Sequence, residues 1–189
     1  RYSNTNYILL GMVVEQVTGT PLSQQIRWRI IEPLGMHNTF FEPDELPPGG
    51  TARGYSGRRD YTDVNLSFVW GAGAMVSTAD DLGRFAQALF GGVLLGPEAL
   101  SEMHGFVSVA GAWGTRHLTY GLGLMQDVMS IGPSIDDQPR SHIHSMVRGH
   151  TGGLLGYRSA MWYVPHSGMT IVVALNQMSK DPNVVVTDV

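Results

Sequence analysis

The sequence predicts an α+β fold in which a helical segment is followed by an antiparallel sheet. In the N-terminal part, apolar residues recur at helical spacing. The C-terminal part instead holds short runs rich in Val, Ile, Tyr and Trp, separated by Gly, Pro and Asp. Helices first and a meander of strands last are typical of the α+β class. We expect a mainly helical region with irregular loops over 1–116 and antiparallel strands over 117–189.

Two helices are expected at the start of the chain. The first covers Asn4–Val17 and carries apolar residues on all its faces, which predicts that it is deeply buried. It ends at Gly19. Thr20 and Pro21 then supply an N-cap and a first-turn proline for a second helix, which runs to about Ile31.

Two more helices follow an irregular stretch. The segment Phe41–Tyr61 is rich in Pro and Gly, so we place no regular element there. Ser77 and Asp80 form a capping box that starts a helix over Thr78–Phe90. A shorter helix is expected over Pro97–His104.

Four strands are expected in the C-terminal part. The connection between the last two, His166-Ser167-Gly168, is a hairpin signal. Together the strands predict an antiparallel sheet. Their expected ranges are Tyr120–Met129, Ile143–His150, Tyr157–Val164 and Thr170–Asn176.

Composition excludes several classes of function. The chain has 189 residues, no cysteine and a formal net charge of −4. Disulfide scaffolds, thiolate zinc sites and cysteine nucleophiles are therefore excluded, and a basic nucleic-acid-binding surface has little support. The longest apolar stretch, Tyr7–Val14, is far shorter than the roughly 20 residues that span a bilayer. Lys180 is the only lysine and follows Ser179, so the Gly-Lys pair of a P-loop is missing.

Polar groups suited to catalysis open the first expected helix, in the motif Tyr2-Ser3-Asn4. The dipole of a helix favours negative charge at its N-terminus, so we expect the Tyr2 phenol to ionise more easily than its reference pKa of about 10 indicates. A tyrosine with these properties suits a general base. The amide of Asn4 can donate to a substrate carbonyl and accept from a cation. Taken alone, such a triplet is typical of a helix cap.

A second polar motif, His150-Thr151-Gly152, ends a predicted strand. Gly152 and Gly153 leave the edge of this strand bare, so a substrate or a developing oxyanion can approach backbone N–H groups there. Taken alone, this motif is typical of a strand that leads into a turn. Its occurrence together with the N-terminal motif and their long flanking segments favours a catalytic interpretation.

With these flanks, the chain resembles the serine β-lactamase and D,D-peptidase family, which includes proteins similar to penicillin-binding proteins. The similarity is greatest to the branch of class C β-lactamases, D-alanyl-D-alanine carboxypeptidases and related esterases, and it implies the β-lactamase/transpeptidase-like fold. It is carried by Tyr2–Tyr7, Ile31–Met36, Gly71–Leu82, Tyr120–Gly123 and Gly149–Asn176.

In this family a Ser-x-x-Lys motif supplies the nucleophile. The single lysine, Lys180, is preceded three residues earlier by Gln177, so the motif does not occur in these residues. The resemblance therefore implies the C-terminal portion of a serine hydrolase, one incomplete catalytic domain. Its partner would be the upstream segment of the same protein, which carries the nucleophile. Cell-wall chemistry would imply an extracytoplasmic location.

The resemblance also implies a role for each site residue, without a cofactor or metal. Tyr2 would shuttle protons, Asn4 would orient the substrate amide, and Thr151 would bind a substrate carboxylate. The oxyanion would lie at the N–H of Gly153. His150 replaces the lysine common in β-lactamases, and a neutral imidazole attracts anionic substrates less. The expected substrates are D-alanyl peptides, β-lactams or small esters, with peptidase or esterase activity favoured.

Two alternatives remain open. One is a catalytically silent member of the same fold that binds peptidoglycan-like ligands or a protein partner. An intact Ser-x-x-Lys motif in the upstream sequence would favour the enzyme over this alternative. The other is a metal-dependent hydrolase, because His142 and His144 share one strand face and could join His150 as metal ligands.

Asp80 and Asp81 resemble a carboxylate pair, but both fall in the first turn of a helix, where acidic residues are favourable.

Overall fold

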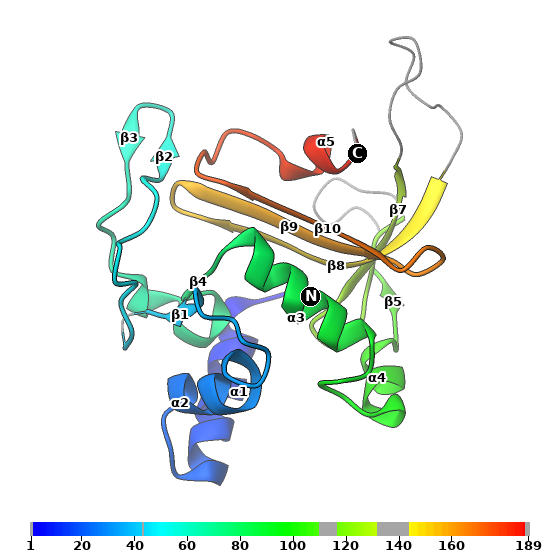
Figure 1. Ribbon diagram of the computed structural model, residues 1–189, viewed down its shortest axis with the longest axis horizontal. Coiled ribbons are helices and arrows are strands. Elements are labelled where there is room, and N and C mark those ends of the chain that lie inside the picture. The colour runs from blue at the N-terminus through cyan, green and yellow to red at the C-terminus, as the bar shows by residue number, and fades with distance from the viewer. Residues whose placement is uncertain (1, 43, 110–116, 132–143, 188–189) are drawn as a thin grey trace.

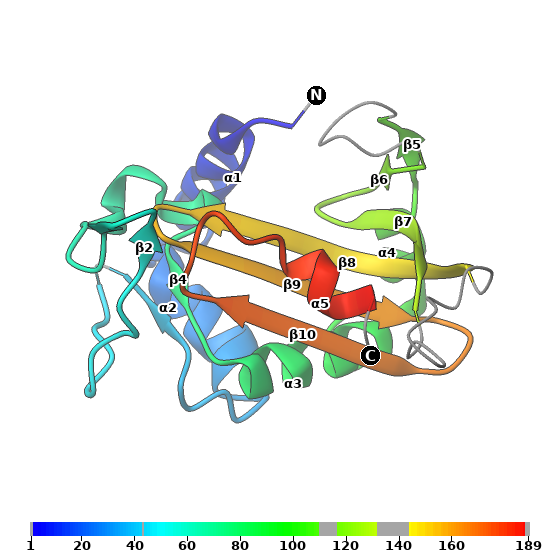
Figure 2. The ribbon, with the colours of Figure 1, turned by 90° about the horizontal axis from the view of Figure 1, so that it is seen from above.

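The structure is a computed structural model that describes residues 2–42, 44–109, 117–131 and 144–187. Within them, a six-stranded antiparallel sheet carries helix α5 (Pro182–Thr187) on one face and the other helices on the opposite face (Figures 1 and 2). The expected α+β arrangement is confirmed. The other α-helices are α1 (Asn4–Thr18), α2 (Leu22–Ile26), α3 (Ala79–Phe90) and α4 (Pro97–Met103).

The strands of the main sheet follow one another in the order β10-β9-β8-β7-β6-β5, so each is hydrogen-bonded to its neighbour in the chain. The predicted hairpin after β9 is confirmed, with Gly168 in the left-handed conformation at φ 71°. The strands are β5 (Val107–Ser108), β6 (Thr119–Tyr120), β7 (Met125–Ser130), β8 (His144–Leu154), β9 (Tyr157–Val164) and β10 (Met169–Leu175).

The strand register determines which side chains meet which helices. Trp162 of β9 pairs with Ile171 of β10, and both belong to the core cluster that also contains Val186 of α5. The next residue of β9, Tyr163, points to the opposite face because side chains alternate along a strand. Its ring stacks on Phe90 of α3, with centroids 4.5 Å apart. The central strands are thus covered on both faces.

The predicted strand Tyr120–Met129 is wrong as a single element. The chain reverses between β6 and β7 in a tight turn, where Gly121 N–H donates to the carbonyl of Leu124 at 2.8 Å. Gly123 adopts the left-handed φ of 70° that this turn requires. The next strand, β8, begins at His144, and its expected first residue, Ile143, lies outside the described residues.

The prediction that the first helix is deeply buried is also wrong. Gly11 is the one buried residue of α1, because only part of the helix surface packs against α2 and the short 3₁₀ turn η3 (Trp70–Ala72). No helix in the described part of the chain is long and apolar enough to cross a membrane. The exposed apolar side chains of α1 are Leu9, Leu10, Met12, Val13 and Val17, each more than half exposed.

The second helix reaches Ile31, but differently from the prediction. After α2 it widens into a π-helical turn, η1 (Arg27–Ile31), in which Glu32 N–H donates to the carbonyl of Arg27. Its first turn is not capped by Thr20. The Glu15 carboxylate of α1 instead accepts from the N–H of Leu22 at 2.8 Å. This bond joins the two helices.

The cap of α3 lies one residue later than predicted. The Thr78 hydroxyl accepts from the N–H of Asp81, whereas Ser77 is hydrogen-bonded to the Thr39 hydroxyl at 2.8 Å. Thr39 precedes the short strand β1 (Phe40–Phe41), which pairs with β4 (Met75–Val76). The start of α3 is thereby tied to a distant segment.

The segment 41–61, predicted to lack regular elements, contains a short hairpin. It is formed by β2 (Tyr55–Ser56) and β3 (Arg59–Asp60) and is anchored to the ends of β9 and β10. Tyr55 N–H donates to carbonyls of Gly156 and Asn176. A further 3₁₀ turn, η2 (Leu66–Phe68), follows it.

Candidate active site

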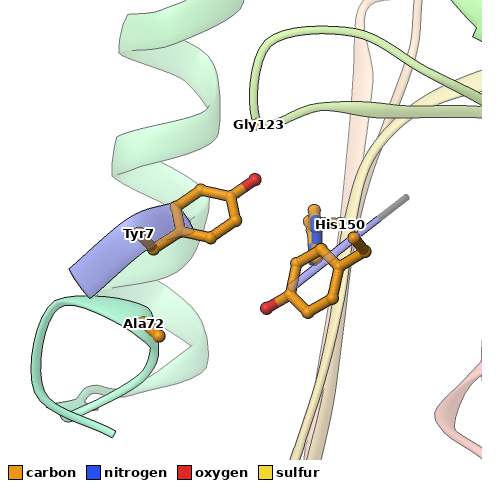
Figure 3. Close-up of a pocket in the computed structure, with 5 residues that line it drawn as sticks. Tyr7, Ala72, Gly123 and His150 are labelled. Carbon is orange, nitrogen blue, oxygen red and sulfur yellow. The ribbon is translucent and has the colours of Figure 1, made fainter. Parts of the chain in front are cut away.

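A pocket of about 210 Å³ lies between the start of α1 and strand β8 (Figure 3). Its walls come from segments far apart in the sequence. The lining residues are Tyr2, Tyr7, Ala72, Gly123 and His150.

Helix α1 is held in place by a close approach at Gly11. A Cβ atom at this position would lie 2.9 Å from the Trp70 ring and 2.9 Å from the Leu22 side chain, so a larger residue would displace these side chains. Gly71, the residue after Trp70, also approaches the helix closely, since a Cβ there would lie 3.1 Å from the Tyr7 carbonyl oxygen. These contacts place the loop that carries Ala72 beside Tyr7.

The β6–β7 turn forms a second wall. Leu122 N–H donates to the carbonyl of Met103 at the end of α4, which anchors the turn. Gly121 also approaches this carbonyl so closely that a Cβ would lie 2.2 Å from the oxygen. Gly123 then faces Tyr7, whose hydroxyl oxygen would be 3.8 Å from a Cβ there.

Strand β8 supplies the third wall. Its pairing with β7 ends at Gly149, opposite Met125, while pairing with β9 continues to Leu154. Within the described strands, residues 150–154 therefore have a ladder partner on one side only. At Gly149 a Cβ would lie 1.8 Å from the Met161 carbonyl oxygen, so this glycine allows β8 and β9 to approach where the pocket begins.

A chain of hydrogen bonds links these walls. The hydroxyl oxygens of Tyr7 and Tyr120 are 2.7 Å apart, and the Tyr120 hydroxyl is 2.9 Å from Nε2 of His150. The other ring nitrogen, Nδ1, lies 2.6 Å from the carbonyl oxygen of Thr151. Helix α1, strand β6 and strand β8 are thus joined at the pocket.

Tyr2 completes the cluster of rings. Its ring centroid is 5.6 Å from that of Tyr7 and 6.3 Å from those of Tyr120 and His150. It precedes the N-cap of α1, Ser3, whose hydroxyl accepts from the N–H of Thr5. The motifs at the two ends of the chain therefore meet in one pocket.

The electrostatics of the pocket favour neutral forms. Burial, aided by the neighbouring Tyr7, raises the pKa of Tyr2, so the sequence-based expectation of an easily ionised phenol is not met. Burial also raises the pKa of Tyr120, together with its hydrogen bond to Tyr7. The pKa of His150 is lowered by burial, which outweighs the opposing effect of its bond to Thr151. At neutral pH the imidazole is therefore uncharged.

The structure places the predicted site residues unequally. Tyr2 and His150 share the pocket, whereas Asn4 lies exposed at the first position of α1 and is not among the lining residues. The Thr151 side chain lies on the opposite face of β8 from His150, with its hydroxyl 3.9 Å from the Met125 sulfur. Gly152 and Gly153 follow on β8 and are exposed, as a bare strand edge requires.

No metal site is found among the described residues, which contain no group of three or more His, Asp or Glu arranged to hold an ion. His144 is instead hydrogen-bonded to the hydroxyl of Ser130 at 3.2 Å, and both ring nitrogens of His150 have partners. His142 lies outside the described residues.

Sequence reasoning assigned no role to three lining residues, Tyr7, Ala72 and Gly123, or to Tyr120, which is hydrogen-bonded to Tyr7 and His150. A signal existed for Tyr7, because it belongs to the segment Tyr2–Tyr7 that carries the family resemblance. Tyr120 is 113 residues from Tyr7, and only the fold brings them together.

Comparison with known proteins agrees with the fold. The D-amino acid amidase from Ochrobactrum anthropi SV3 is 34% identical with a TM-score of 0.80, and the match covers 96% of this chain and 52% of that one. A D-stereospecific amidohydrolase from Streptomyces sp. is 32% identical with a TM-score of 0.77, covering 94% and 50%. The provisionally named penicillin-binding protein PbpX of Bacillus subtilis (strain 168) is 28% identical over 149 residues, 71% of this chain and 38% of PbpX.

The chain thus spans about half the length of the two similar solved structures and 38% of PbpX. A class C beta-lactamase with a TM-score of 0.72 and 23% identity shares the fold. The model of the beta-lactamase family matches residues 1–188. The chain therefore belongs to the beta-lactamase family, a family of hydrolases and penicillin-binding proteins.

Proposed function

We propose that the chain is the C-terminal part of a serine hydrolase that acts through an acyl-enzyme on D-alanyl peptides, β-lactams, small esters or related amides. The nucleophilic Ser-x-x-Lys motif would come from sequence upstream of Arg1. The observation that carries this proposal is the meeting of Tyr2 and His150 in one pocket. Similar proteins named as amidases add support for an acyl substrate.

The reaction would consist of two acyl transfers. The serine hydroxyl attacks the substrate carbonyl and gives its proton to Tyr2, and the tetrahedral intermediate then expels the amine or alcohol, which takes up that proton. Water next attacks the acyl-enzyme, gives its proton to Tyr2 and releases the acid, and the serine is reprotonated. Proton and leaving group thus balance in each half of the reaction.

Tyr2 needs a nearby cation to perform this role. Its pKa is raised in the described structure by burial and by Tyr7, and a phenol with a raised pKa is a poor base at neutral pH. The lysine of the proposed Ser-x-x-Lys motif would supply the positive charge that favours the phenolate. The proposal thus requires that the upstream segment place both the serine and the lysine of this motif in the pocket.

The open part of β8 would bind the substrate. Gly152 and Gly153 are exposed and lie beyond the end of β7 pairing, so their backbone groups are accessible. The N–H of Gly153 and that of the upstream serine would form the oxyanion hole, in which removal of one donor typically costs about 10²- to 10³-fold in rate. The resemblance assigns Thr151 to substrate binding and Asn4 to orientation of the substrate amide, but neither residue is in the pocket lining, so the geometry adds no support for these two roles.

The exposure of apolar side chains on α1 is an argument that a further segment covers this side of the helix. Leu9 is 54% exposed, Met12 55% and Val17 79%. Leu9, Val13 and Val17 follow one another at four-residue spacing and so share one side of the helix, and exposed apolar surface of this kind is typical of an interaction site. We assign it to the upstream segment of the same protein, whose nucleophile would then lie close to Tyr2 at the start of the same helix.

The test uses the protein with its upstream sequence and compares Tyr2→Phe with Tyr163→Phe. Tyr163 lies on β9 and stacks on Phe90, away from the pocket, so it is a matched control for loss of one phenolic hydroxyl. We expect Tyr2→Phe to lower kcat on an amide or ester substrate by about 10²-fold or more, with the control unaffected. Equal activity of the two variants would overturn the role of Tyr2. Absence of turnover by the unaltered protein would favour the catalytically silent alternative.

A further inference from the structure

The hydrogen-bond chain through Tyr120 has a fixed direction. A carbonyl oxygen only accepts, so the 2.6 Å contact with Thr151 requires His150 to carry a proton on Nδ1. In a neutral imidazole Nε2 is then an acceptor, and the Tyr120 hydroxyl at 2.9 Å donates to it. Because the single Tyr120 proton is used in this bond, the Tyr7 hydroxyl donates to the Tyr120 oxygen.

The neutral state of His150 agrees with its surroundings. Its ring is partly buried, and this burial lowers its pKa. The rings of Tyr2 and Tyr120 lie 6.3 and 5.7 Å from the His150 ring between centroids, and Tyr7 lines the same pocket. On the neighbouring strand β9 the opposite residue is Met161, which is uncharged.

The charged residue nearest along the same face of β8 is Arg148, two positions before His150. Its guanidinium Nε donates to Gln126 on β7 at 3.0 Å, and the group lies over the Phe106 ring. Arg148 is thus directed toward β7 and Phe106. The part of the pocket wall formed by His150 presents an uncharged imidazole whose two nitrogens are both hydrogen-bonded.

We propose that Tyr120 is a positioning residue that determines specificity by holding His150 neutral and fully hydrogen-bonded, so that the site prefers acyl substrates with an uncharged group beside His150. Primary amides and esters have this property, whereas a carboxylate there would lose water without gaining a cation. This inference rests on the proposed function and narrows its substrate class.

The first experiment measures the proton positions of His150 rather than activity. The protein with its upstream sequence is labelled with ¹⁵N-histidine, and the His150 resonances are identified by their loss in His150→Gln. We expect Nδ1 protonated and Nε2 unprotonated at neutral pH. In Tyr120→Phe, Nε2 loses its donor, so the pKa of His150 should rise toward its ordinary value. Tyr163→Phe, which keeps the pocket intact, should titrate like the unaltered protein.

The second experiment measures specificity with a pair of peptides that differ only in a C-terminal amide or carboxylate. We expect the unaltered protein to have the higher kcat/KM on the amide, and Tyr120→Phe to reduce the amide-to-carboxylate ratio at least about tenfold, equivalent to 1.4 kcal/mol. His150→Lys, which introduces a cation, should shift the ratio in the same direction. Tyr163→Phe should leave it unchanged.

The outcomes separate this inference from the proposed function. A protonated Nε2 in the unaltered protein, or an unchanged His150 titration in Tyr120→Phe, would overturn the positioning role even if the enzyme is active. An unchanged substrate ratio in both Tyr120→Phe and His150→Lys would overturn the specificity role. If the unaltered protein hydrolyses neither peptide, the proposed function fails and the specificity claim fails with it, while the titration still tests the positioning role.

Discussion

Asp80 and Asp81 are neighbours in the first turn of α3, but their surroundings differ. Asp81 is 3% exposed, and its carboxylate accepts from the backbone N–H of Asn38 at 2.8 Å and from the Thr39 hydroxyl at 2.9 Å. Asp80 is exposed. Asp81→Ala removes the acceptor of two donors that join α3 to the segment before β1, whereas Asp80→Ala removes a surface charge.

The two substitutions should differ severalfold in cost. Hydrogen bonds to a charged group contribute roughly 1.5–3 kcal/mol each. Because water can reach part of the space left by truncation, we expect Asp81→Ala to cost about 3 kcal/mol, near the lower end of the range for two bonds. Asp80→Ala loses only its favourable position near the helix N-terminus, roughly 0.3–1 kcal/mol.

Thermal unfolding followed by circular dichroism at pH 7 measures this difference. For a chain of this length, 1 kcal/mol changes Tm by about 2–4 °C. Asp81→Ala should therefore lower Tm by about 6–12 °C and Asp80→Ala by about 4 °C at most. Equal small decreases for both would refute the reasoning, since they would mean that the buried carboxylate acts only as a first-turn acid.

Three other predictions concern the sheet. Because burial lowers the pKa of His150, the free energy of unfolding should fall as pH falls below about 6.5, and His150→Gln should flatten this part of the curve in a pH series of thermal melts. Gly149→Ala forces a Cβ toward the Met161 carbonyl, 1.8 Å away, and should cost about 3 kcal/mol or more in urea unfolding; an unaltered midpoint would contradict the close approach. Asn183→Ala leaves the buried indole N–H of Trp162 without its acceptor at 2.9 Å and should cost roughly 1–3 kcal/mol in the same assay, while a neutral effect would show that this bond does not hold α5.

Elements with local signals could be predicted from the sequence. The helix expected over Thr78–Phe90 is α3 within one residue, and the strand expected over Tyr157–Val164 has the observed bounds of β9. Both depend on spacing of apolar residues and on nearby turn residues. Where a single strand was expected from Tyr120, a reversal occurs, because Gly123 can adopt a left-handed φ and Met103, far away in sequence, anchors the turn.

Burial of α1 could not be predicted from its own pattern. A helix that is apolar on all sides is buried only where other elements cover all sides, and periodicity does not identify those elements. In the described structure η3 and α2 cover the side that contains Gly11, and Leu10 on another side is 59% exposed. The approach at Gly11 depends on Trp70, which no local signal connects to the helix.

The candidate site was predicted in part. Motif resemblance selected Tyr2 and His150, which share the pocket. It gave no reason to connect Tyr7 with Tyr120, because their hydrogen bond depends on how α1 meets the β6–β7 turn. The direction of the Tyr2 pKa shift was also wrong, since the helix dipole is a local effect whereas burial by neighbouring rings is a consequence of the fold.

The central claim is that the attacking hydroxyl comes from outside these residues while Tyr2 and His150 handle protons and position the substrate. An alkyl fluorophosphonate labels an activated serine covalently, and peptide mass spectrometry locates the adduct. With the upstream sequence present, we predict one adduct on a serine of a Ser-x-x-Lys motif outside residues 1–189, and no adduct when residues 1–189 are treated alone. An adduct on any serine within residues 1–189 would contradict the account.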